Sequence, residues 1–296
     1  MNKKRIIPAL VITVLINVPL FSQDIEDYIS RYTNLNGPGY IQPLADAFGA
    51  NLNTGLYHGA HIKKMGLQLY LGVVATTSFI PDKRKTFTAT TEGNFLPVKT
   101  AEVPTLFGST KPVNVTGNAG TTFVFPGGLN LSMLPLAVPQ LTLGSVFGTN
   151  ITIRYFGYNI NKDVGKLSLF SWGLRHSISQ YIPILPVDLS VGFYKQQFSI
   201  GTYAKCNSWL LSAQASKKIV IFTFYGGLGY EKSKMDIKYT SQNDNTNVAF
   251  SLNGSNTIRV TAGVTFNLGP VKLNVDYNLA SQSVLCVGLG IGIGDK

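Results

Sequence analysis

Histidine is the residue of this sequence best suited to metal or nucleophile chemistry, and two of its three copies stand close together in "HGAH", at His58 and His61. A zinc site needs three or four ligands, and no cysteine or carboxylate follows this pair at ligand distance. The third histidine, His176, precedes Ser177, but neighbouring residues of a strand point to opposite faces and cannot pair directly. We therefore expect no metal, no cofactor and no enzymatic activity.

Charged side chains recur on one face of segments whose other face is apolar. This polar face carries Arg154, Arg175, Asp188, Arg259, Lys272 and Asp276, together with Asn274 and Asn278. Charges inside a barrel pair with each other or with a plug, and in an open channel they tune selectivity. We predict that these residues line a lumen. Ion pairs that hold a plug are favoured over a ring of charged side chains that selects a substrate. The partners expected from the N-terminal segment are Glu26, Asp27, Arg31 and Asp46.

The segments that would position these charges alternate with period two, as in "VLCVGLGIGIGDK" at the end of the chain. Successive strand residues point to opposite faces, so this segment has an aliphatic face and an almost bare one with Gly288, Gly290 and Gly292. We predict that the aliphatic face meets lipid and that the glycine face points into the lumen, where it leaves room for a plug or a ligand. Cys206 and Cys286 are expected to be isolated residues on strand faces rather than a disulfide.

Ten alternating segments of about ten residues or more are visible between residue 66 and the end of the chain, which is long enough to cross a bilayer as tilted strands. Residues 80–137 are expected to add none or two. The predicted fold is all-β: a transmembrane antiparallel β-barrel of about 12 strands, with 10 or 14 as alternatives. Short turns, such as Gly269–Pro270, alternate with longer connections, as they do in outer-membrane barrels.

The N-terminal region differs from the rest of the chain. A basic start, an apolar run from Ile6 to Phe21 and a small residue at Ser22 predict a signal peptide over residues 1–22. Residues 23–62 are predicted to form a helical hatch, with one helix near Ile25–Tyr32 and a second from Leu44 to Phe48 that follows Pro43. Residues 63–296 would form the barrel.

Composition agrees with an exported membrane protein: 13% of residues are charged, about half the usual share, and 45% are hydrophobic. The formal net charge of +11 falls to +8 without the basic signal residues and is dispersed along the chain. This pattern favours contact with acidic outer-membrane lipid and lipopolysaccharide over nucleic acid, for which no basic stripe or motif is present.

An apolar stretch interrupts the connection between the first two predicted strands. It contains Phe123, Phe125, Leu129, Leu131, Met133 and Leu134. We interpret it either as one or two further strands or as an outer segment that captures a hydrophobic small molecule.

Three stretches together resemble an exported Gram-negative barrel family related to FadL-type transporters of hydrophobic compounds. They are "YIQPLADAFGANLNTGLYHGA" (40–60), "VPQLTLGSVFGTNITIRYFG" (138–157) and "LFSWGLRHSISQYIPILPVDLSVGFYKQQF" (169–198). The resemblance implies a lumen plugged by an N-terminal hatch, in the position of residues 24–60, and located in the outer membrane. The Asn-Pro-Ala signature of that hatch is absent here.

Two functions follow as hypotheses. The first is uptake of small hydrophobic molecules, in which the outer apolar segment captures the solute and movement of the hatch admits it. The second is a plugged structural barrel that serves as an envelope anchor or assembly partner.

Overall fold

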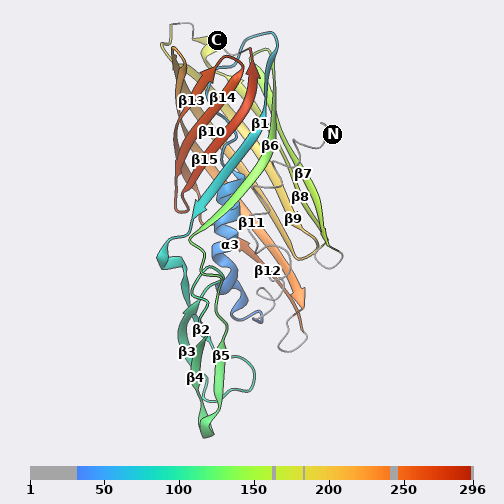
Figure 1. The fold of residues 1–296 in the computed structure, drawn as a ribbon, viewed down its shortest axis with the longest axis vertical. Helices are drawn as coiled ribbons and strands as arrows, with labels where there is room; N and C mark the ends of the chain where they lie inside the picture. Colours follow the sequence, from blue (N-terminus) through green and yellow to red (C-terminus); the bar gives the residue numbers. More distant parts are fainter. Residues whose placement is uncertain (1–31, 162–164, 183, 241–245, 295–296) are drawn as a thin grey trace, which may run out of the picture.

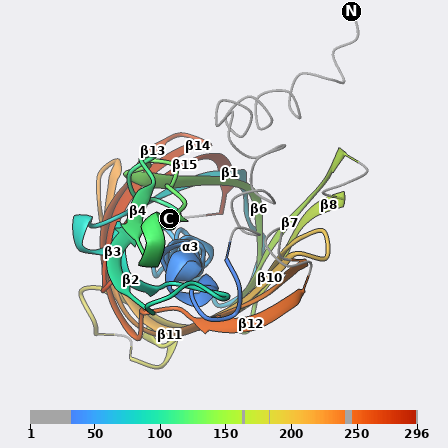
Figure 2. The same cartoon turned by 90° about the horizontal axis from the view of Figure 1, so that it is seen from below.

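The computed structural model describes residues 32–161, 165–182, 184–240 and 246–294, and it shows an antiparallel β-barrel around an N-terminal helix (Figures 1 and 2). Ten strands close the wall, since β10 pairs with β11 and β1 pairs with β15. The wall strands are β1 (Gln68–Phe79), β6 (Met133–Val146), β7 (Thr149–Asn161), β8 (Gly165–Ser177), β9 (Asp188–Ile200), β10 (Ala204–Ile219), β11 (Phe222–Thr240), β13 (Ile258–Leu268), β14 (Val271–Leu279) and β15 (Val284–Ile293). The all-β barrel is confirmed, with ten wall strands, the smaller alternative, instead of about twelve.

The two ends of the barrel differ. At one end, which we call the short-turn end, β6–β7, β10–β11 and β13–β14 are joined by two residues each, and β1 begins there. The β8–β9 connection at this end carries the short 3-10 helix η4 (Ser179–Tyr181). The opposite end, which we call the module end, carries the long β1–β6 connection and the strand β12 (Asn247–Asn253), which extends β11 beyond the closed wall.

Residues 80–132 form a separate module below the barrel (Figure 1). Its strands β2 (Thr86–Thr90) and β3 (Thr100–Pro104) pair with each other, as do β4 (Val113–Thr116) and β5 (Thr122–Phe125). Two short 3-10 helices, η2 (Asp82–Arg84) and η3 (Asn118–Gly120), complete it. These strands pair with each other in two separate hairpins, so this region adds nothing to the strand count of the wall.

The helix α3 (Gly37–Leu52) lies inside the ring (Figure 2). It is longer than the predicted helix from Leu44 to Phe48, and Pro43 lies in its interior instead of at its start. Proline there removes one hydrogen bond, but 13 of the 16 helix residues are buried, so packing sets the length of the helix. The predicted signal peptide (1–22) and the helix near residues 25–32 lie outside the described residues, except for Tyr32.

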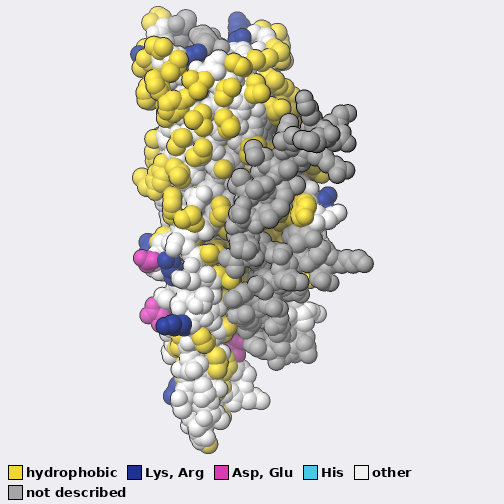
Figure 3. Space-filling model, viewed as in Figure 1, with side chains coloured by type: hydrophobic (Ala, Val, Ile, Leu, Met, Phe, Trp, Pro, Cys, Tyr) yellow, Lys and Arg dark blue, Asp and Glu magenta, His cyan; other side chains and the backbone are white. Residues whose placement is uncertain are grey.

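The outward face of the wall is apolar. Leu285, Val287, Leu289, Ile291 and Ile293 of β15 are 37–57% exposed, and the residues between them are buried. Figure 3 shows hydrophobic side chains over the upper part of the barrel, with charged side chains gathered at the top rim and over the lower region. Exposed apolar surface of this extent is typical of strands that face lipid. Within the described ranges, no helix has the length and apolar character needed to span a membrane.

The bare face of β15 is covered by long side chains from its neighbours. A Cβ added at Gly290 would lie 2.7 Å from the ring of Tyr70, and one at Gly292 would lie 3.1 Å from Lys272. At Gly288 it would collide with the amide group of Asn274. The glycine face does point inward, as predicted, but the space that it leaves is filled by wall residues and not by the plug.

The apolar core lies toward the module end. It joins α3 residues such as Ile41 and Phe48 to wall residues such as Phe198 and Ile237 and to Phe107 of the module. The rings of Phe48 and Phe198 stack with centroids 4.8 Å apart. Plug, wall and module therefore share one hydrophobic core.

Candidate functional site

The candidate site is the lumen, which residues 32–62 traverse from end to end; we call these residues the plug. At the module end, Tyr239 Oη of β11 donates a hydrogen bond to Tyr32 O (2.8 Å). At the short-turn end, Ala60 N donates to Ser216 Oγ of β10 (2.8 Å). The plug then joins β1 through residues 63–67. The chain thus enters the ring at the module end and leaves it at the short-turn end.

A buried ion pair on the wall binds the end of α3. Arg259 of β13 and Glu231 of β11 are 2% and 1% exposed, and Arg259 Nη2 lies 3.0 Å from both Glu231 carboxylate oxygens. The same guanidinium donates to Ala50 O (2.9 Å) and to Thr54 Oγ1. The last carbonyls of a helix lack intrahelical donors and carry partial negative charge, so a cation here satisfies both needs.

A second wall arginine binds the next carbonyls of the plug. Arg154 of β7 is 2% exposed and donates to Thr54 O (3.0 Å) and Leu52 O (3.4 Å). Its Nε donates to Gln140 Oε1 of β6 (2.7 Å), which fixes the guanidinium in place. Hydrogen bonds from charged donors contribute about 1.5–3 kcal/mol each. The helix end is therefore held from two sides of the ring.

A third arginine and a threonine hydroxyl hold the plug near the short-turn end. Arg175 of β8 donates to Gly59 O (2.6 Å) and to Asn150 Oδ1 (3.2 Å). Thr265 Oγ1 of β13 donates to His58 O (2.7 Å). In this half of the lumen, wall side chains bind backbone carbonyls of the plug, and Leu56 and Tyr57 pack in a smaller apolar cluster with the wall.

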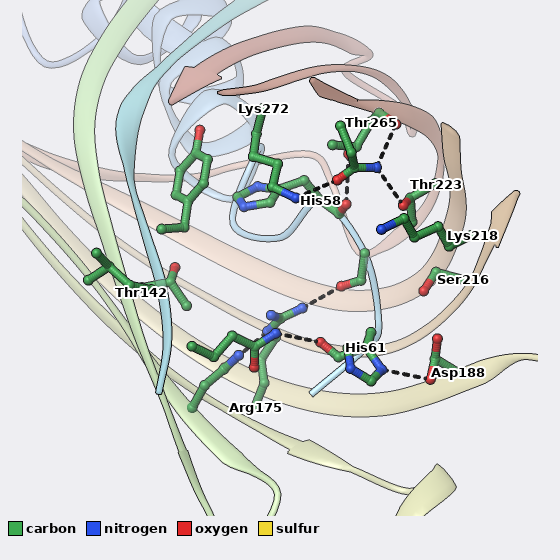
Figure 4. Close-up of a pocket in the computed structure, with 16 residues that line it drawn as sticks. His58, His61, Thr142, Arg175, Asp188, Ser216, Lys218, Thr223, Thr265 and Lys272 are labelled. Atoms are coloured by element: carbon green, nitrogen blue, oxygen red, sulfur yellow. Dashed lines mark hydrogen bonds and ion pairs between the residues drawn. The ribbon is translucent and has the colours of Figure 1, made fainter. Parts of the chain in front are cut away.

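An open pocket lies beside this last stretch of the plug (Figure 4). Its cavity volume is about 90 Å³. Most of the residues that line it are polar, and they come from the plug and from every wall strand except β15. His61 of the plug contacts Asp188 of β9, with Nδ1 2.9 Å from Oδ1.

The residues predicted to line the lumen are placed there by the structure. Arg154, Arg175, Arg259, Lys272 and Asp276 are 2–7% exposed on a wall whose outward face is apolar. Asp276 accepts hydrogen bonds from Tyr225 Oη (2.8 Å) and Asn278 Nδ2 (2.6 Å), all within the wall. Their role toward a ligand stays a prediction.

The predicted ion pairs between plug carboxylates and wall cations are wrong for the described residues. The wall arginines bind plug carbonyls, and the carboxylate partner of Arg259 is Glu231, which belongs to the wall. Asp46 pairs with Arg84 of the module. Glu26, Asp27 and Arg31 lie outside the described residues.

The apolar segment around residues 123–134 is mostly buried. Phe125 and Leu134 are 0% and 1% exposed within the shared core, and Phe123, Leu129 and Leu131 pack against it. Met133, at 51%, is the exposed member of this set. These side chains therefore do not form an open outer patch, because the module folds them onto α3; a role in capture stays a prediction.

Sequence reasoning missed Glu231, the most buried carboxylate of the site. Its signal was available, since it shares the inward parity of Tyr225 and Gly227 on β11. Thr54 was missed as well, and no pattern around it marks a contact with two wall arginines. Cys206 and Cys286 are free and buried, as expected.

Beyond the apolar belt, β11 continues with charged outward residues. Lys232, Lys234, Asp236 and Lys238 follow Tyr230 at alternate positions. The hydrogen bond from Ser251 Oγ of β12 (2.6 Å) lowers the pKa of Asp236, and Lys234, 3.3 Å away, adds to the effect. The outward face of this extension is thus suited to water, whereas the outward face of the closed wall is suited to an apolar surrounding.

The comparisons with solved structures return outer-membrane barrels at low similarity. A loop-deletion mutant of OmpT from Vibrio cholerae shares 9% identity at a TM-score of 0.29, covering 77% of this chain and 99% of that one. The channel DcaP of Acinetobacter baumannii shares 8% identity at a TM-score of 0.22, covering 79% and 100%. The attachment protein Ail of Yersinia pestis shares 12% identity at a TM-score of 0.19, covering 77% and 98%. Such scores say nothing about function, and the barrel assignment rests on the strand pairing described above.

No curated protein sequence matches this chain. The FadL-type resemblance is thus neither supported nor opposed, and the barrel that it implied is confirmed by the strand order. A family profile described as a family of unknown function, DUF6588, matches residues 1–293, and the chain belongs to that family.

Proposed function

We propose that this protein is an outer-membrane barrel that its own N-terminal segment keeps closed, and that it serves as an anchor for the module outside the membrane. The apolar belt supports a membrane location, and the predicted signal peptide over residues 1–22 supports export. Outer-membrane barrels place short turns in the periplasm and long connections outside the cell. By that rule the module and the β11–β12 extension face the exterior.

The observation that carries this proposal is the way the plug is bound. Arg154, Arg175 and Arg259 reach it from three strands, and each donates to backbone carbonyls that have no partner within α3. The three guanidinium groups are 2–7% exposed, so moving the plug would take carbonyl acceptors away from buried charged donors. A lumen held in this way is suited to support and not to passage.

Conductance tests this proposal directly. The purified chain, reconstituted in planar lipid bilayers, should show no steady conductance. Replacing two plug-binding arginines together (Arg154→Ala with Arg259→Ala) should produce openings, because the end of α3 loses its cations. Lys205→Ala, an exposed change on β10, is the matched control and should stay closed. Steady conductance of the unmodified chain would refute a closed barrel.

Uptake of hydrophobic molecules is the second candidate function. The observation that favours it is that residues 63–67 are the covalent connection between the plug and β1, and a shift of the plug as a unit toward the short-turn end would not stretch this connection. The buried capture residues described above weaken it.

A disulfide that fixes the plug separates the two functions. A Cβ added at Gly55 would lie 2.7 Å from the Cys286 sulfur, and Val74→Ala makes room beside it. Cysteine at this position, with φ +69°, costs about 1–2 kcal/mol of strain. Uptake of a hydrophobic fluorescent dye by cells should be lost on oxidation of Gly55→Cys/Val74→Ala if the plug must move. It should be unchanged if the protein is an anchor, and Gly55→Ser/Val74→Ala is the control.

A further inference from the structure

The pocket at the short-turn end gathers positive charge. Arg175 of β8, Lys218 of β10 and Lys272 of β14 line it from three strands (Figure 4). Among the described lining residues, Asp188 is the sole carboxylate, and its Oδ1 lies 2.9 Å from His61 Nδ1. The lining therefore has more cationic than anionic side chains.

A buried donor in the same lining lacks a hydrogen-bond acceptor. Asn150 is 2% exposed, and its Oδ1 accepts from Arg175 Nε, a group that can only donate. This contact fixes the amide orientation and leaves Asn150 Nδ2 buried without a partner. Buried polar groups are nearly always paired, so an unpaired donor beside Arg175 points to a missing acceptor.

The hydrogen bonds of Arg175 support the same conclusion. Its guanidinium donates to the amide oxygen of Asn150 and to Gly59 O, both of which are neutral acceptors. Arg175 is 7% exposed, and a buried cation is stabilised by an anion close to it.

We propose that this pocket binds a phosphate-type anion, either free in solution or as a lipid headgroup at the membrane surface. Such an anion carries acceptor oxygens on all sides of one centre, which suits donors that line the pocket from β7, β8, β10 and β14. A carboxylate is planar and offers acceptors on one edge only. The site goes beyond the proposed anchor function, and a closed lumen is not required for it.

Isothermal titration calorimetry of the full chain in a zwitterionic, phosphate-free detergent tests the site. The probes are inorganic phosphate, a short-chain phosphatidylglycerol and acetate, each titrated at fixed ionic strength because surface attraction is screened by salt. Saturable binding of phosphate or of the lipid, with acetate at least tenfold weaker, is the expected result. Binding of the lipid alone identifies a headgroup site, and binding of both identifies a phosphate site open to either.

Variants decide whether this pocket is responsible. Lys218→Ala and Lys272→Ala should each weaken binding at least fivefold, and Asn150→Leu should weaken it while removing the unpaired amide. Lys218 is exposed, so its variant should fold even if the buried ones do not. Lys205→Ala, at the module end, is the control and should bind as the unmodified chain does. The proposal would be overturned if neither phosphate probe showed saturable binding. It would also be overturned if Lys218→Ala and Lys272→Ala both bound the probes as tightly as the unmodified chain does.

Discussion

The buried pair of Arg259 and Glu231 gives the sharpest stability prediction. Glu231→Gln keeps the shape of the side chain and removes its charge, which leaves Arg259 with neutral partners at 2% exposure. Breaking a buried pair in this way costs roughly 3–5 kcal/mol. For a chain of this size, 1 kcal/mol corresponds to about 2 °C in melting temperature, so the midpoint should fall by about 6–10 °C.

The assay is the temperature at which the folded barrel loses its altered gel mobility in one fixed detergent. Glu231→Gln combined with Arg259→Met removes both charges and should recover at least half of the loss, because no unpaired charge remains. Glu102→Gln, on the exposed face of β3, is the matched control and should stay within about 1 °C, since surface changes cost under about 0.5 kcal/mol. A Glu231→Gln midpoint equal to that of the control would refute the reasoning, and so would a double variant less stable than the single one.

Three further predictions concern packing and charge, each checked by the same melting assay. Gly288→Ala should lower the midpoint, because its Cβ would collide with the side-chain amide of Asn274; recovery by Asn274→Ala would verify the contact, and an unchanged midpoint would contradict it. Phe125→Ala should cost about 3–5 kcal/mol and the exposed change Met133→Ala under about 1 kcal/mol, and similar losses would contradict the burial of the apolar segment. The lowered pKa of Asp236 means that its carboxylate stabilises the fold above its unfolded pKa of about 3.9, and that this contribution disappears as pH falls through the folded pKa. Asp236→Asn should therefore be less stable than the unmodified chain at pH 7 and equal to it near pH 2, and a deficit that persists in acid would count against this account.

The wall could be predicted from sequence because strand alternation reports burial at every second residue. Arg154 and Arg259 fall on the inward parity, and Leu289 and Ile291 on the outward one, as the periodicity indicates. The boundary of α3 could not be predicted, because Pro43 is a local stop signal that buried packing on several sides overrides.

The hydrogen-bond partners of the inward-facing wall residues could not be predicted from the sequence. Parity shows that Arg259 points inward, but not that it meets Ala50 O, since a backbone carbonyl leaves no mark in the residue types. The apolar segment around Phe125 was ambiguous for a related reason: composition shows that it must be covered, and only the tertiary fold shows that α3 covers it.

The path of residues 32–62 through the ring has a mechanical consequence. The plug enters the closed ring at one rim and is covalently joined to that ring at the other rim, so the chain is threaded through its own barrel. Because β1 is bonded on both edges, to β6 and β15, the ring cannot be closed first and threaded afterwards without drawing the free end of the chain through its bore. Pairing of β15 with β1 is therefore the step that encloses the plug. Release of the plug would require the residues upstream of Tyr32 to pass back through the lumen. Enclosure of the plug and closure of the barrel are therefore coupled steps of assembly.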